Sequence, residues 1–117
     1  MKSYTFVVLT NAEDGRENEF NDWYTNRHLS DVIGIPGVVS ARRFRIAAVQ
    51  RPVAVSPYKY LALYEIETDD LAQVVEALAK RSGTEMMPVS DAMSAEKFNY
   101  IFEAITEKRT NDQYGRE

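Results

Sequence analysis

The chain has 117 residues, a formal net charge of −4, 11% aromatic residues, one histidine and no cysteine. This length suits one compact domain, and the aromatic content argues against intrinsic disorder. The lack of cysteine excludes disulfides, thiolate nucleophiles and Cys-ligated metal centres, and one histidine excludes a multi-histidine metal site within a protomer. The acidic excess argues against nucleic acid as a partner. Any chemistry must then come from His28, carboxylates, tyrosines, arginines or a bound cofactor, and the function favoured below needs no metal and no tightly bound cofactor.

The N-terminal segment gives an expectation about location. It runs from Lys2 directly into a short alternating stretch, Tyr4 to Thr10, which polar residues then interrupt. This stretch is too short and too polar for a signal peptide or a membrane-spanning helix. We expect a cytoplasmic protein with no membrane partner.

The first part of the chain predicts a strand and then a helix. Residues Ser3–Thr10 alternate with both faces largely apolar, which is typical of a strand covered on two sides. Asn11 or Asp14 could cap the helix that follows, from Arg16 to about Ile33. A four-residue spacing gives this helix one slowly drifting stripe, formed by Phe20, Tyr24, His28 and Val32.

The rest of the chain predicts three further strands and a second helix. In chain order we expect a strand from Val38 to Ala48, a loop from Gln50 to Tyr58, a strand from Tyr60 to Glu67, a helix ending at Arg81, an irregular segment from Thr84 to Glu96 and a strand from Phe98 to Thr106. Thr68 or Asp69 is expected to cap the second helix. The methionines of the irregular segment are expected to pack over a pocket mouth or a dimer seam: Met86, Met87 and Met93.

The order strand, helix, strand, strand, helix, strand is typical of the ferredoxin-like α+β fold. In that fold two βαβ units build a four-stranded antiparallel sheet with both helices on one face. We expect a single domain over residues 1–107, followed by a polar tail over residues 108–117 that frays or packs on a partner.

One face of such a sheet has no helix to cover it. If Leu61 and Leu63 face the helices, the open face carries a set of aromatic side chains, namely Tyr4, Phe6, Tyr60, Tyr64, Tyr100 and Phe102. That face is too apolar to remain in water. A second copy of the chain is the economical cover, because a two-fold interface is self-complementary. We expect a homodimer through the open sheet face.

Part of the sequence resembles a known family. The residues that carry the resemblance are Phe20, Trp23, Tyr24, Arg27 and His28 on the first helix, then Ile35-Pro36-Gly37-Val38 and Ala41-Arg42-Arg43-Phe44. This pattern resembles the EthD-like branch of the dimeric α/β-barrel proteins. The resemblance implies two ferredoxin-like protomers whose sheets form a barrel, with a small-molecule pocket between helices and sheet in each. Similar proteins include cofactor-independent monooxygenases, cyclases, dehydratases and isomerases that act on aromatic or polyketide-like compounds and lactones.

His28 is the main catalytic candidate. It lies four residues after Tyr24 and so on the same helix face, near a helix C-terminus whose dipole favours imidazolium. Its side chain can transfer a proton near neutral pH. The alternative is a structural histidine hydrogen-bonded to a backbone carbonyl or to Asp31.

Aromatic and arginine side chains are the candidates for substrate binding. Trp23, Tyr24 and Tyr64 offer apolar area with a polar handle, which suits a planar oxygenated ligand, and Phe6 is expected beside them. Each could instead be core packing. Arg42 could hold a ligand oxygen if it points inward, or could form an ion pair with Glu65 or Asp31. Its neighbours Arg43 and Arg45 fit a solvated edge strand better.

These residues favour a small-molecule enzyme. The expected ligand is hydrophobic and oxygenated, and the expected step is His28-assisted proton transfer without a metal, as in an isomerase, cyclase, dehydratase or cofactor-independent monooxygenase. The alternatives are a noncatalytic binding or accessory protein of a degradation pathway, which needs the pocket but no titrating histidine, and a structural dimer with a collapsed pocket.

Overall fold

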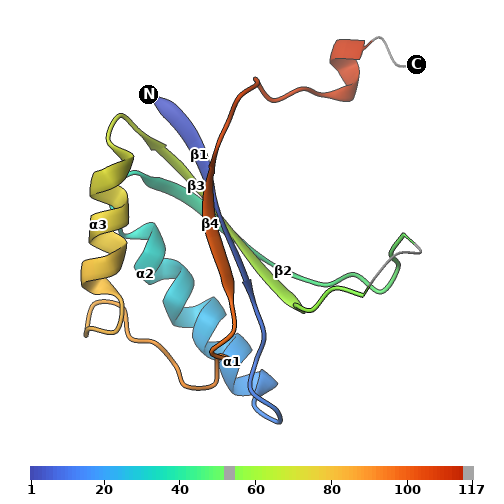
Figure 1. The fold of residues 1–117 in the computed structure, drawn as a ribbon, viewed down its shortest axis with the longest axis vertical. Helices are drawn as coiled ribbons and strands as arrows, with labels where there is room; N and C mark the ends of the chain where they lie inside the picture. Colours follow the sequence, from blue (N-terminus) through green and yellow to red (C-terminus); the bar gives the residue numbers. More distant parts are fainter. Residues whose placement is uncertain (52–54, 115–117) are drawn as a thin grey trace.

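The computed structural model describes residues 1–51 and 55–114. A four-stranded sheet with the spatial order β2-β3-β1-β4 carries its helices on one face (Figure 1), and each pairing is antiparallel. The elements are β1 (Lys2–Thr10), α1 (Glu17–Trp23), η1 (Tyr24–His28), α2 (Leu29–Ile33), β2 (Val38–Arg45), β3 (Tyr60–Thr68), α3 (Leu71–Arg81), β4 (Phe98–Glu103) and η2 (Asn111–Tyr114). The chain therefore has the ferredoxin-like α+β arrangement that the element order predicted.

The first predicted helix is continuous over α1, η1 and α2, since the backbone angles at both junctions are helical. Its predicted stripe faces the sheet: Phe20, Tyr24 and Val32 are buried and His28 is half-buried. The expected cap was wrong. Arg16 occupies the cap position without a side-chain cap bond, and the side chain of Asn11 instead bonds to the backbone of residues 57 and 59.

The cap of α3 also lies one residue beyond the predicted positions. The Asp70 carboxylate accepts the backbone N–H of Gln73 at 3.3 Å, so neither Thr68 nor Asp69 caps the helix. The Thr68 hydroxyl accepts the backbone N–H of Asp70 at 3.0 Å. Thr68 therefore stabilises the turn that precedes the helix, which leaves Asp70 to satisfy the exposed N–H groups of the first turn.

A glycine turn brings α2 and β2 close to α3. Gly37 has a φ of +101°, and a Cβ at this position would lie 2.9 Å from Cγ2 of Val74 on α3. Its carbonyl accepts the backbone N–H of Glu67 at 2.9 Å, which continues the pairing beyond β2. Only glycine combines this backbone conformation with so close an approach.

The faces of β1 and β3 are exchanged relative to the prediction, whereas Tyr100 and Phe102 of β4 lie on the open face as predicted. Tyr60, Ala62, Tyr64 and Ile66 are buried beneath the helices, Tyr4 and Phe6 of β1 are half-buried beside them, and Leu61 and Leu63 lie on the open face. Buried phenols need hydrogen-bond partners, and the helices supply them. The Tyr60 hydroxyl bonds to the carboxylate of Glu17, and the Tyr64 hydroxyl bonds to Tyr24.

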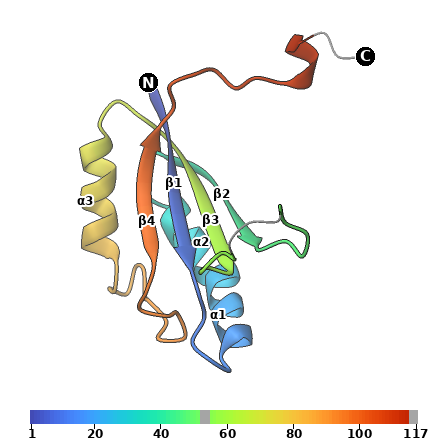
Figure 2. The same ribbon diagram turned by 45° about the vertical axis from the view of Figure 1, so that its right-hand side comes forward.

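The open face is nevertheless apolar. It follows from the strand register that Val7, Leu61 and Leu63 share this face with Tyr100 and Phe102 of the edge strand β4. Tyr100 is 60% exposed and Phe102 is 55% exposed. The described parts of the β2–β3 connection, residues 46–51 and 55–59, and residues 104–114 after β4 project beyond the sheet (Figures 1 and 2).

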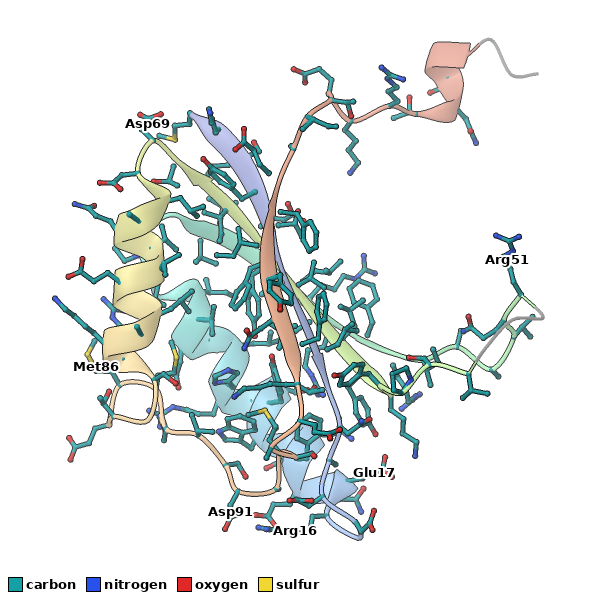
Figure 3. All side chains as sticks on the ribbon, in the orientation of Figure 1. Arg16, Glu17, Arg51, Asp69, Met86 and Asp91 are labelled. Atoms are coloured by element: carbon teal, nitrogen blue, oxygen red, sulfur yellow. The ribbon has the colours of Figure 1, made fainter. Side chains whose placement is uncertain are left out.

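The segment between α3 and β4 is fixed to both helical elements. At one end Arg16 bonds through its guanidinium to the Asp91 carboxylate at 2.7 Å, next to Glu17 in Figure 3. Backbone bonds join Glu13 to Ala92 and Ser94 to Asn11. These contacts hold the segment across the end of α1.

No helix in the described part of the chain is long and apolar enough to cross a membrane.

Candidate functional site

A cavity of about 480 Å³ lies between α3, the first helix and the strands β1 and β4. Its volume is within the range of small-molecule sites, about 300–1,000 Å³. Most of its lining is aliphatic, aromatic or methionine side chains, from Phe6, Val8, Tyr24, Val32, Tyr64, Val75, Leu78, Ala79, Met87, Val89, Met93, Tyr100 and Ile101. The other lining residues are His28, Ser82, Lys97 and Asn99. A ligand that is largely apolar and has few polar groups would fit such a lining.

The first helix reaches this cavity through a π-helical turn. The turn spans Tyr24–His28 and lies between the two α-helical segments. In an α-helix a four-residue step slightly exceeds a full turn, whereas in the wider π-turn it falls short of one, so the turn offsets the drift of the stripe. Tyr24 and His28 both line the cavity as a result. π-turns of this kind are frequent at functional sites.

A tyrosine pair forms the inner polar group of the cavity. The Tyr64 hydroxyl donates to the Tyr24 hydroxyl at 3.0 Å, and both side chains are buried. Burial raises the pKa of both phenols, so both are neutral near pH 7. The Tyr24 hydroxyl has its own proton left to donate, which makes it the group that can bind a ligand oxygen.

His28 has two ring contacts and no hydrogen bond to another described residue. Its ring stacks on Trp23 with 4.7 Å between centroids and meets the Tyr24 ring edge-on at 4.8 Å. Nδ1 is shielded from solvent and has no partner. Asp31, the expected structural partner, is engaged by Arg27 at 2.8 Å. The alternative of a hydrogen-bonded structural histidine is therefore not what the fold contains.

Burial determines the charge state of His28. It lowers the pKa of the imidazole to about 4; Asp31 opposes this lowering, whereas Lys97 and Arg43 add to it. The side chain is accordingly neutral at pH 7. The expectation that a helix dipole favours imidazolium was wrong, because α2 extends the helix past His28 and desolvation is the larger effect.

Arg42 and Arg43 lie on opposite faces of the sheet, and the expectation of a solvated position for Arg43 was wrong. Arg42 is level with Leu63 on the open face, where its guanidinium lies 5.4 Å from the centre of the Phe44 ring. It makes neither of the expected ion pairs within the described residues. Arg43 faces the helices, 4.6 Å from the centre of the Tyr24 ring, and donates to the side chains of Asn21 and Thr25.

The structure brings together four of the six predicted site residues, namely His28, Tyr24, Tyr64 and Phe6. Trp23 lies behind His28 and donates its indole N–H to the Pro88 carbonyl at 3.3 Å, so it supports the ring that lines the cavity. Arg42 does not reach the cavity, because alternation along β2 directs it to the open face.

Two polar lining residues escaped the sequence analysis. Lys97 lies between the expected irregular segment and the expected strand and was assigned to neither, whereas Asn99 was assigned only to the strand, and neither residue was given a role. The signal that could have found them is parity: Asn99 is level with Val8, and Ile101 with Phe6, on the helix-covered face. The prediction for the methionines holds for Met87 and Met93, which line the cavity, whereas Met86 is exposed away from it (Figure 3).

The described residues contain no cluster of three or more His, Cys, Asp or Glu side chains that could hold a metal ion. In particular, no carboxylate belongs to the lining of the cavity. The chemistry available from the lining is hydrogen bonding by three phenols, a serine hydroxyl and an amide, proton exchange by His28, and one ammonium group.

No protein-family model and no curated protein matches the sequence. Solved structures do match. MhuD, a heme-degrader from Mycobacterium tuberculosis, has a TM-score of 0.59 at 15% identity, with 91% of this chain and 99% of that chain covered. SnoaB, a cofactor-independent oxygenase from Streptomyces nogalater, has a TM-score of 0.57 at 16% identity, with 92% and 97% covered. These likenesses establish the fold.

An EthD family protein is also among the similar structures. That protein, from Bacillus halodurans, is 18% identical over 90% of this chain and 100% of its own, with a TM-score of 0.49. At such identities the comparisons carry the ferredoxin-like architecture and leave the reaction to be argued from the site.

Proposed function

We propose that this protein is a small-molecule enzyme that acts on a hydrophobic, oxygenated compound by proton transfer to His28. The observation that carries the proposal is a neutral, unpartnered imidazole at the wall of an apolar cavity of about 480 Å³. The reaction classes that need such a base and no metal are isomerisation, cyclisation, dehydration and cofactor-independent oxygenation. SnoaB, which shares the fold, is described as a cofactor-independent oxygenase.

The proposed step begins with a substrate held by shape and by one hydrogen bond. Phe6 and Tyr64 would contact the apolar body, and the Tyr24 hydroxyl would donate to a substrate oxygen. His28 would accept a proton from an acidic O–H or C–H bond, whose electron pair stays on the substrate and spreads onto its oxygen. The resulting anion would raise the pKa of His28 above its value in the unliganded protein.

The test compares proton abstraction in the wild type, His28→Gln and Ser30→Ala. Planar phenols and cyclic 1,3-diketones are supplied in D2O with air, and deuterium incorporation and oxygen uptake are measured. General base catalysis contributes about 100-fold or more, so His28→Gln should lose at least that factor. Ser30→Ala changes an exposed residue of the same helix outside the cavity and should retain the wild-type rate.

The pH profile provides a second readout. Because the base must be neutral and its pKa is about 4, kcat/KM governed by His28 should be flat between pH 8 and pH 5 and fall near pH 4. Full activity in His28→Gln would remove His28 from the mechanism.

One observation favours a second candidate, a noncatalytic binding or accessory protein. Within residues 1–51 and 55–114 no side chain orients the His28 ring by a hydrogen bond, and Asp31 is held by Arg27. This candidate would be supported if the probe compounds bind in the cavity and none of them shows deuterium incorporation or oxygen uptake.

The same proposal includes a homodimer formed through the open sheet face. The face is apolar, with Phe44, Tyr100 and Phe102 each more than a third exposed. Exposed patches of this kind in a small protein mark contact surfaces. Tyr100 also belongs to the cavity lining, so such a dimer would adjoin the cavity at β4.

A further inference from the structure

The cavity has one formal charge on its lining, and that charge is not paired. Lys97 is the only charged lysine, arginine or carboxylate among the lining residues. Within residues 1–51 and 55–114 it forms no ion pair and no side-chain hydrogen bond, whereas Lys2, Lys59 and Lys80 each have a carboxylate within 3.4 Å. The ammonium group therefore keeps its three donors for water or for a ligand.

The position of Lys97 places it beside a second polar group. Asn99 is level with Val8 of β1, and Ile101 is level with Phe6, so these two residues of β4 are on the cavity side of the sheet. Lys97 directly precedes β4 and, like Asn99, lines the cavity. An ammonium and an amide thus follow one another along the rim of an otherwise apolar cavity.

The positive charge at the cavity contrasts with the acidic charge of the whole chain. The protein carries a net charge of −4, yet no carboxylate in the described part of the chain lines the cavity. Lys97 is near enough to His28 to lower the pKa of the imidazole. The cavity is consequently a locally positive site in an acidic protein, which attracts an anion and disfavours a cation.

We propose that the natural ligand has an apolar body with one negatively charged oxygen, a carboxylate or an enolate or phenolate, and that Lys97 binds this oxygen at the rim. This proposal rests on the proposed function, since it specifies the substrate class of the same cavity. Lys97 would be a specificity-determining residue, because it discriminates between charged and neutral compounds of the same shape.

The test uses two probes of nearly equal shape, 2-naphthoate and 2-naphthamide, which differ in charge. Binding is followed by NMR of 13C-labelled methionine methyl groups. Met87 and Met93 line the cavity and report on binding there, whereas Met1 and Met86 are 87% and 59% exposed and report on other surfaces. Titrations give a dissociation constant for each probe at the same site.

The variants are Lys97→Met, Lys97→Arg and the control Lys80→Met. Lys80 is an exposed lysine of α3 outside the cavity lining, paired with Glu76 at 2.7 Å. We expect the wild type to bind 2-naphthoate about three- to five-fold more tightly than 2-naphthamide, the factor for a solvent-accessible ion pair. Lys97→Met should abolish this preference by weakening 2-naphthoate alone, while Lys97→Arg and Lys80→Met should preserve it.

The outcomes separate this proposal from the function on which it rests. Equal affinities in the wild type, or a preference that survives in Lys97→Met, would overturn the role of Lys97 while leaving the cavity as a binding site. Absence of any shift at Met87 and Met93 with both probes would overturn the ligand-binding cavity and, with it, the proposed function.

Discussion

The charge of His28 depends on its surroundings more than on its position in the helix. Two aromatic rings contact the imidazole, at 4.7 and 4.8 Å between centroids, and they replace water without offering a hydrogen bond. Desolvation disfavours the charged form of histidine. The residue that the sequence singled out as a proton donor or acceptor is thus held as an acceptor.

This burial predicts how stability depends on pH. The pKa of His28 is about 4 in the folded protein and about 6.5 in an unfolded chain, so between these values the unfolded chain binds the extra proton. The free energy of unfolding should therefore be fully present above pH 6.5 and fall by about 3 kcal/mol as the pH decreases to 4. Urea denaturation at several pH values measures this loss.

The control for that experiment is His28→Gln, which cannot titrate. Its stability should lack the decline between pH 6.5 and pH 4, so the difference between the two proteins isolates His28. The lowered pKa of the Glu17 carboxyl acts in both proteins alike and at lower pH, because that group loses its stabilising contact only when it is protonated. Parallel curves for the two proteins would contradict the assigned charge state.

For single residues, the sequence predicted which side chains lie together but did not predict the charge state of His28 or the hydrogen-bond partners of the tyrosines. The four-residue spacing on the first helix placed Tyr24 and His28 on one face. Which of Arg42 and Arg43 points toward the helices depends on which residues of β2 face the helices, and two adjacent arginines do not indicate this. The hydrogen bond between the buried hydroxyls of Tyr24 and Tyr64 joins the helix to the sheet, so it could not be predicted before the two elements were placed together.

Among the elements, α3 offers a sharp test of local structure. Asp70→Ala removes the side chain that accepts the backbone N–H of Gln73, and loss of such a cap costs about 1 kcal/mol of stability. Asp69→Ala is the matched control, since Asp69 is exposed and its carboxylate pairs with the N-terminal amino group at 3.5 Å without capping the helix. Chemical denaturation of both variants should show the loss in Asp70→Ala alone; equal losses would contradict the assigned cap.

The strands show why element order was predictable while the faces of the sheet were not. Periodicity and turn residues located β1, β3 and both helices to within a few residues. Both parities of β3 are apolar, Tyr60, Ala62 and Tyr64 on one and Leu61 and Leu63 on the other, so hydrophobicity alone does not orient the strand. Hydroxyl partners on the first helix decide the matter, and these are long-range contacts.

For the whole molecule, the open face predicts association that a single charge should disrupt. Phe102→Lys places an ammonium group on that face, so the proposed dimer of 13.4 kDa chains should dissociate to monomers in light scattering after size exclusion. Ile33→Lys is the control, because Ile33 is a 42% exposed apolar residue on the helix side. A wild type that is monomeric at high concentration would contradict the dimer.

The π-turn between α1 and α2 has a consequence for comparing this chain with others of the same fold. Its bonding spans five residues instead of four, so relative to a plain α-helix it contains one additional residue. Deleting that residue would rotate Leu29–Ile33 by roughly 100° about the helix axis and turn Val32 away from the cavity. A relative with an uninterrupted α-helix could be superimposed on this chain only with a one-residue gap inside the helix.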